Sequence, residues 1–184
     1  GADGQYYRLI QDDIDYGPDR AAGAVAIIAA MLLERYRAGA KPLALVSMDN
    51  CSHNGEKLRS AVLEIGQEWK KKGFVDEEFL SYISDEEKIA FPWSMIDKIT
   101  PRPSEAVRAM LQDAGVEDMD IVVTDKQTYI APFVNAEEPQ YLVVEDAFPN
   151  GRPPLECAGV LFTNRETVEK VERMKVCTCL NPLH

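Results

Sequence analysis

The stretch Leu43-Ala-Leu-Val-Ser-Met48, an almost continuous apolar run between two helical patterns, decides the fold class of this chain. Such a short run is typical of a strand that is covered on both faces. Residues 21–37 are apolar on nearly every side and predict a buried helix that ends at Gly39 and Pro42. Residues 54–72 repeat apolar side chains at helical spacing and predict a second helix. Helix, buried strand, loop and helix form the unit of a doubly wound α/β sheet.

The patterns outside this unit are shorter and fit the same fold class. The further strands that the sequence predicts lie at residues 89–101, where the strand runs into a loop, 120–124, 141–145 and 160–163. The further helices lie at residues 76–88, at the surface, 103–114 and 166–174. Thr163 or Asn164 would cap the last of these helices. Residues 5–16 are polar and predict an irregular connection.

The length and net charge of the chain exclude several classes of function. The 184 residues suit one domain, or one domain with an appendage, and the apolar content of 46% is enough for a core. The net charge of -11 argues against binding to nucleic acid, which needs clustered basic residues. No apolar run approaches the roughly 20 residues that a membrane span needs. The N-terminus shows no secretory signal, and the acidic composition is usual for a cytoplasmic enzyme.

The four cysteines are expected to be reduced thiols, because no secretory signal precedes them. They are Cys51, Cys157, Cys177 and Cys179. Cys177-x-Cys179 and His184, together with Cys51-Ser-His53, contain enough ligands for a zinc ion. Their spacing fits no common zinc pattern, in which two to four residues separate paired cysteines. We therefore expect no metal site, and a zinc-binding protein remains the alternative.

Polar residues follow the predicted strand at residues 43–48. In doubly wound sheets, ligands bind beyond the carboxyl ends of the strands, and Asp49 and Asn50 lie at that edge. The same residues also suit an ordinary turn and helix cap, so both interpretations stay open. Asp97 is similarly either half of a surface ion pair with Lys98 or a carboxylate that orients a group in the cleft.

The end of the chain combines a base, a neutral amide and an imidazole in Lys175, Asn181 and His184. Most helical lysines are solvated, but Lys175 has apolar neighbours, and a lysine removed from water gives up its proton more readily. Six residues turn an ideal helix by about 240°, so Lys175 and Asn181 share a face only if the helix bends before Pro182. This set of groups suits transfer of a proton and a hydride at a secondary alcohol.

These stretches together resemble a known family, the polyol-specific long-chain dehydrogenases/reductases, which include mannitol dehydrogenases and fructuronate reductases. The similar stretches are Lys175-x5-Asn181-x2-His184, Ser47-Met-Asp-Asn50-Cys-Ser-His-Asn54-Gly55, Phe91-Pro-Trp-Ser-Met-Ile-Asp97-Lys-Ile-Thr-Pro101, and Val144-Glu145-Asp146-x-Phe148 followed by Gly151-Arg152-Pro153. Their order and spacing agree with the family over most of the chain. Mild departures are Met48, Ile96, Lys98 and Pro182, where Cys, Val, Arg and Gly are usual.

The resemblance implies a role for each of four catalytic residues. Lys175 would be the general base in alcohol oxidation and the acid in the reverse reaction. Asn50 and Asn181 would form the pair that stabilises the reacting oxygen as its charge changes. His184 would bind and orient the hydroxyl groups of the substrate.

The resemblance also implies how the cofactor is used. Asp97 and Asn50 would lie at the cofactor and substrate cleft, and Glu172, one turn before Lys175, would tune the access of water or protons. The family uses NAD or NADP without a metal, so we expect NAD, with NADP not excluded.

The resemblance further implies a domain organisation. Residues 1–164 would be the later part of the NAD(P)-binding Rossmann-like domain, and residues 165–184 would begin a helical C-terminal domain. The glycine-rich turn that holds the pyrophosphate is not in this sequence, so we expect the isolated chain to be catalytically incompetent. A monomer or a small homo-oligomer is expected.

The expected reaction interconverts a sugar alcohol or aldonate and its ketose or keto-uronate. Mannonate and fructuronate are preferred, because the run Cys-Thr-Cys-Leu-Asn-Pro-Leu-His resembles the uronate reductases. Mannitol with fructose, or altronate with tagaturonate, are the other substrate pairs. Arg152 is a candidate partner for a substrate carboxylate. A non-catalytic α/β binding module remains the competing interpretation.

Overall fold

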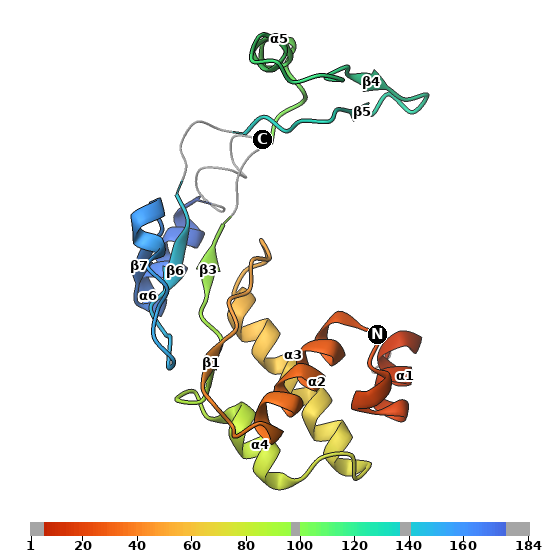
Figure 1. Ribbon diagram of the computed structural model, residues 1–184, viewed down its shortest axis with the longest axis vertical. Helices are drawn as coiled ribbons and strands as arrows, with labels where there is room; N and C mark the ends of the chain where they lie inside the picture. Colours follow the sequence, from red (N-terminus) through yellow and green to blue (C-terminus); the bar gives the residue numbers. More distant parts are fainter. Residues whose placement is uncertain (1–5, 97–99, 137–140, 176–184) are drawn as a thin grey trace.

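The computed structural model describes residues 6–96, 100–136 and 141–175. Figure 1 shows a cluster of helices at one end, a small sheet with one helix beside it, and an arm at the opposite end. The helical cluster contains α1 (Arg8–Tyr16), the short 3₁₀ turn η1 (Pro18–Arg20), α2 (Ala24–Arg37), α3 (Asn54–Lys71) and α4 (Glu77–Ser84).

Helices α2, α3 and α4 bury their apolar stripes against one another, as the helical spacing predicts. The buried side chains that they share include Leu32, Leu33, Val62, Ile65, Trp69, Phe79 and Ile83. The prediction of a surface helix at residues 76–88 is therefore wrong in its burial. The charged residues occupy only one side of α4, and the apolar side chains of Phe79, Tyr82 and Ile83 lie on the other side, which meets the core.

The prediction of an irregular connection at residues 5–16 is also wrong, since this segment forms α1. Ile14 is buried on the face of α1 that meets the core. The carboxylate of Asp13 is also buried, and it accepts hydrogen bonds from the backbone N–H groups of Ala22 and Gly23. Trp69 donates its indole N–H to the backbone oxygen of Asp13 at 2.9 Å. The polar appearance of this segment hid these internal contacts.

The strands are short. The strand predicted at residues 43–48 covers only residues 43–44, and the prediction that it is covered on both faces is wrong, because it is half-buried. The strand at residues 129–130 was not predicted, and the other described strands fall within predicted runs. β1 (Leu43–Ala44) pairs in parallel with β2 (Ile89–Ala90). β3 (Ser94–Met95) pairs antiparallel with β6 (Val143–Glu145), and β6 pairs in parallel with β7 (Leu161–Thr163). Helix α6 (Arg165–Glu172) begins directly after β7, with Asn164 as its cap, and Val168 is buried against Trp93, Met95 and Val143. The short 3₁₀ helix η2 (Leu155–Ala158) precedes β7.

The arm contains α5 (Glu105–Asp113) and a hairpin of β4 (Val122–Val123) and β5 (Tyr129–Ile130). Among the described residues, none in these three elements is buried, so the arm adds nothing to either core. Within the part of the chain that the structure describes, no helix combines the length and apolar character that a bilayer-spanning segment needs.

Candidate active site

The loop after β1 brings Asn50 to the carboxyl end of the parallel pair β1–β2. Asp49 shapes the loop, since its carboxylate accepts the backbone N–H of Cys51 at 2.8 Å. This backbone hydrogen bond, foremost, lowers the pKa of Asp49 below its usual value. Burial, foremost, raises the pKa of the Cys51 thiol, so the thiol stays protonated at neutral pH.

Asn54, the first residue of α3, anchors this loop through the hydrogen bonds of its side chain. Its side-chain nitrogen lies 2.8 Å from the backbone oxygen of Asp49 and 3.0 Å from that of Ser94. Its side-chain oxygen accepts the backbone N–H of Ser94 at 3.0 Å and that of Gly55 at 2.8 Å. The Ser94 hydroxyl also donates to the backbone oxygen of Ser47 at 2.6 Å. Because Asn54 is buried, these bonds join the loop, α3 and β3 into one unit.

Gly55 allows α3 to start this close to the segment between β2 and β3. A Cβ atom at this position would lie 2.4 Å from the backbone oxygen of Phe91 and 2.7 Å from Cδ1 of Trp93. Those distances are too short for any side chain without movement of the backbone. The glycine is therefore required by the close approach of the helix to this segment.

A small pocket brings together residues that lie far apart in the sequence. Asn50 from the loop and Glu172 from α6 both line it, together with Ser94 and Ile96. The Asn50 side chain is exposed and makes no hydrogen bond within the described part of the chain, so its amide is available to a ligand. The cavity measures only about 10 Å³, room for about one water molecule, and the Ser94 hydroxyl already donates to Ser47, so Asn50 and Glu172 line one edge of a site and do not enclose a ligand.

Lys175 lies beyond Glu172, where α6 continues as a π-helical turn at residues 173–175. Its side chain is only 5% exposed, and its Nζ lies 4.6 Å from the centre of the Tyr141 ring. Tyr141 lines an open cavity of about 480 Å³, and Ile96 lines both this cavity and the pocket of Asn50. The apolar surroundings that the sequence indicates for Lys175 are thus present.

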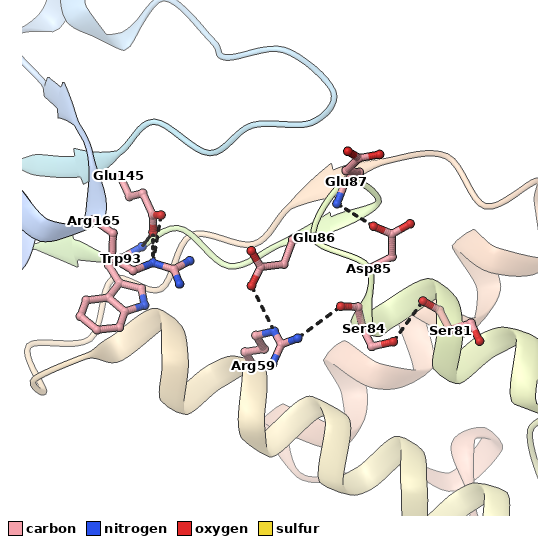
Figure 2. Close-up of polar contacts among 9 residues, drawn as sticks. All are labelled: Arg59, Ser81, Ser84, Asp85, Glu86, Glu87, Trp93, Glu145 and Arg165. Carbon is pink, nitrogen blue, oxygen red and sulfur yellow. Dashed lines mark hydrogen bonds and ion pairs between the residues drawn. The ribbon is translucent and has the colours of Figure 1, made fainter.

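A charged group fixes the start of α6 (Figure 2). Glu145 on β6 accepts the Nε–H of Arg165 at 3.0 Å and the backbone N–H of Trp93 at 3.0 Å. The Arg165 guanidinium also lies 5.4 Å from the centre of the Trp93 ring. The contacts hold the N-terminal turn of α6 against β3 and β6.

The structure describes three of the six predicted site residues. Asn50 and Glu172 share a pocket, and Lys175 follows Glu172 by three residues. Asp97, Asn181 and His184 lie outside the described residues, so their roles stay predictions. Sequence reasoning gave no role to Asn54, although its burial makes it the main anchor. Its place at the start of a helix suggested only an ordinary cap.

Two other predictions concern charge and metal. Arg152 is a poor partner for a substrate carboxylate, because Asp146 and Glu156 bind its guanidinium at 2.6 and 3.3 Å and Phe162 lies beneath it. Among the residues that the structure describes, no three His, Cys, Asp or Glu side chains meet in a way that would hold a metal ion. Three of the proposed zinc ligands, Cys177, Cys179 and His184, lie outside the described residues.

Comparison with known proteins shows that the sequence of this chain is similar to those of mannitol dehydrogenases and a mannonate oxidoreductase. The family model described as the mannitol dehydrogenase Rossmann domain matches residues 13–157. The D-mannonate oxidoreductase of Thermotoga maritima is 54% identical over 183 residues, which are 98% of this chain and 34% of that relative. The mannitol 2-dehydrogenase of Phaeosphaeria nodorum is 37% identical over 161 residues, 86% of this chain and 25% of the relative.

Solved structures agree with the sequence comparison. The ternary complex of Pseudomonas fluorescens mannitol 2-dehydrogenase with NAD and D-mannitol superposes with a TM-score of 0.67 at 31% identity, over 92% of this chain and 30% of that chain. The chain thus spans about a third of the length of its curated relatives. The predicted fold class and the predicted resemblance are confirmed, and the chain belongs to the mannitol dehydrogenase family, whose Rossmann domain model it matches.

Proposed function

We propose that the full-length protein carrying this chain is an NAD(P)-dependent oxidoreductase. It interconverts a sugar alcohol or aldonate and its ketose or keto-uronate. The observation that carries this proposal is the shared pocket of Asn50 and Glu172 at the end of β1, with the buried Lys175 three residues further on. The names of the relatives, D-mannonate oxidoreductase and mannitol 2-dehydrogenase, support the same reaction class.

The described residues fit the nicotinamide cofactor that the family implies. The carboxyl end of a parallel strand pair is where doubly wound sheets bind ligands, and the exposed amide of Asn50 lies there. When bound, the nicotinamide accepts or gives the hydride. Asp97 and Asn50 would lie beside it, and NAD is preferred over NADP because the related ternary complex contains NAD.

The chain itself handles the proton and the substrate oxygen. Lys175 takes the hydroxyl proton during oxidation and returns it during reduction. The amides of Asn50 and Asn181 donate to the oxygen as it becomes a carbonyl. His184 orients the substrate hydroxyls. Glu172, beside the pocket, controls access of water or protons to Lys175.

The finer assignments are also proposals. Mannonate and fructuronate are the preferred substrates, supported by the D-mannonate oxidoreductase of Thermotoga maritima. Residues 1–164 would form the later part of the cofactor domain and residues 165–184 the start of a helical domain, so the isolated chain should show no turnover. The acidic composition favours a cytoplasmic enzyme, acting as a monomer or a small homo-oligomer.

The test is nicotinamide absorbance during turnover by the full-length protein. Fructuronate, tagaturonate and fructose are offered in turn with NADH and then NADPH, beside a Lys175→Ala variant. Turnover of one substrate that the variant loses by several orders of magnitude would establish the reaction class, the substrate and the base. A folded protein that binds no NADH and turns over none of them would favour a non-catalytic binding module.

A further inference from the structure

His53 connects the loop that carries Asn50 to the helix that carries Lys175. Its ring stacks on the Trp93 ring, with centres 4.4 Å apart and planes inclined by 26°. Its Nε2 lies 3.8 Å from a carboxylate oxygen of Glu169 on α6. Its backbone N–H donates to a carboxylate oxygen of Glu172 at 3.4 Å. One residue thus contacts the wall of the site and two carboxylates of α6.

The spacing along α6 makes these contacts relevant to Lys175. Glu169 and Glu172 are three residues apart and lie on one face of the helix, and Lys175 follows at the same interval. The N-terminal turn of α6 is already held by the pair of Arg165 and Glu145. The contacts of His53 hold the other half of the helix, immediately before the π-helical turn that presents Lys175.

The backbone conformation of His53 gives a second reason to look for a role. It lies in the left-handed region, with φ 55° and ψ 44°, which glycine, asparagine, aspartate and histidine adopt more readily than other residues. The backbone therefore limits the choice to a few residue types, and the contacts of the side chain distinguish among them. The stacking on Trp93 and the approach to Glu169 are contacts that an imidazole makes and those smaller residues do not.

We propose that His53 is a positioning residue whose ring, stacked on Trp93 and close to Glu169, ties α6, and with it Glu172 and Lys175, to the loop that carries Asn50. This inference rests on the proposed function, because it assigns His53 a part in the reaction of the same site. His53 does not line the pocket of Asn50 and Glu172, so it acts through the placement of α6.

The charged groups near the His53 ring determine the strength of its interaction with Glu169. From α6, the ring faces Glu169 and Glu172, and Glu169 is also bound by Arg173 at 2.9 Å. In its own loop and in α3, the ionisable groups Asp49, Cys51 and Lys57 interact with one another. Arg165 also contacts the Trp93 ring, and Glu145 neutralises its charge. The side chains of His53 and Glu169 are 47% and 36% exposed, so the pair is partly screened and its effect is modest.

The experiment uses the full-length protein with the variants His53→Asn, Glu169→Gln and the double variant. Asparagine tolerates the left-handed backbone and keeps the N–H that donates to Glu172, so the fold is preserved. Glu166→Gln is the matched control, because Glu166 lies on the same helix and pairs with Lys170 at 2.6 Å in solvent. The measurements are kcat and KM at several pH values, and amide hydrogen exchange of residues 165–175.

We expect kcat to fall about two- to fivefold in His53→Asn and in Glu169→Gln, with KM unchanged, the size of one partly exposed ion pair. The double variant should lose less than the two single losses added together, since both changes remove the contact of His53 with Glu169, while Glu169→Gln also removes the pair with Arg173. Exchange of residues 165–175, corrected for intrinsic rates, should be faster in both variants.

Unchanged exchange in His53→Asn would overturn the proposal, and so would faster exchange with an unchanged kcat. If the unaltered protein turns over none of the sugars offered, the proposed function fails. The exchange data then decide by themselves whether His53 holds α6, since they need no turnover.

Discussion

Replacing Asn54 should strongly destabilise the chain. The side chain is buried and bonds to backbone groups of the loop, of α3 and of β3. Asn54→Ala would leave the N–H groups of Ser94 and Gly55 without this acceptor, and would free the carbonyl of Asp49. At about 1 kcal/mol for each of three net bonds, the expected loss of unfolding free energy is about 3 kcal/mol.

Asn54→Asp tests the same reasoning with almost no change of shape. A carboxylate oxygen would replace the NH₂ group that now donates to the carbonyls of Asp49 and Ser94. Burial and these acceptors would raise the pKa of the introduced carboxyl in the folded state, so the folded chain would bind its proton more tightly. The variant should therefore be most stable below the unfolded pKa of about 3.9, and should lose stability as pH rises through the folded pKa.

The assay is urea unfolding of the 184-residue chain, followed by the fluorescence of Trp69 and Trp93. With a slope of about 2 kcal/mol per M, a loss of about 3 kcal/mol moves the midpoint down by about 1.5 M. Asn50→Ala is the matched control, because Asn50 is exposed and its midpoint should move by less than about 0.25 M. A midpoint in Asn54→Ala within that same margin would refute the anchoring role, as would an Asn54→Asp variant that is as stable as the original at pH 8.

Two further substitutions and one chemical modification test the loop. Gly55→Ala should lower the unfolding free energy by about 3 kcal/mol or more, because its Cβ would meet the backbone oxygen of Phe91 at 2.4 Å; an unchanged urea midpoint would contradict this. Asn50→Ala should lower kcat of the full-length protein by about a hundredfold while leaving the urea midpoint in place, and a normal kcat would remove Asn50 from the site. Because burial raises the pKa of the Cys51 thiol, iodoacetamide should modify Cys51 more slowly at pH 8.5 than the exposed Cys157. Peptide mass spectrometry measures both rates, and equal rates would contradict this prediction.

The sequence predicted those parts of the molecule whose apolar pattern repeats. The buried helices and the buried strands β2, β3 and β6 fall within the predicted ranges, because their patterns report directly on burial, whereas the exposed strand β5 was not predicted. Helix α1 was missed because its buried Asp13 is satisfied by backbone N–H groups of residues nine and ten positions further on, which no local pattern reveals. The burial of α4 was missed because three acidic residues at its start, Asp76, Glu77 and Glu78, mask a narrow apolar stripe.

The candidate site was predicted from its reacting groups and not from the groups that hold them. The residue type and apolar neighbours of Lys175 and the strand-end position of Asn50 pointed to these two residues, and the family resemblance pointed to Glu172. Asn54 and His53 owe their importance to partners 40 and 116 residues away, Ser94 and Glu169, and that proximity exists only in the fold.

The loop and α6 must therefore be held together by residues that take no part in the chemistry. The two connections differ in strength, because Asn54 is buried and neutral whereas His53 and Glu169 are partly exposed and charged. A buried amide anchor should contribute mainly to stability, and a screened ion pair should contribute mainly to the placement of α6. Substitution of Asn54 should consequently lower the stability of the fold, and substitution of His53 should loosen the placement of α6. Substitution of Asn50 should lower turnover alone. If all three positions instead lost stability and turnover in proportion, the loop and α6 would have to be regarded as one cooperative unit.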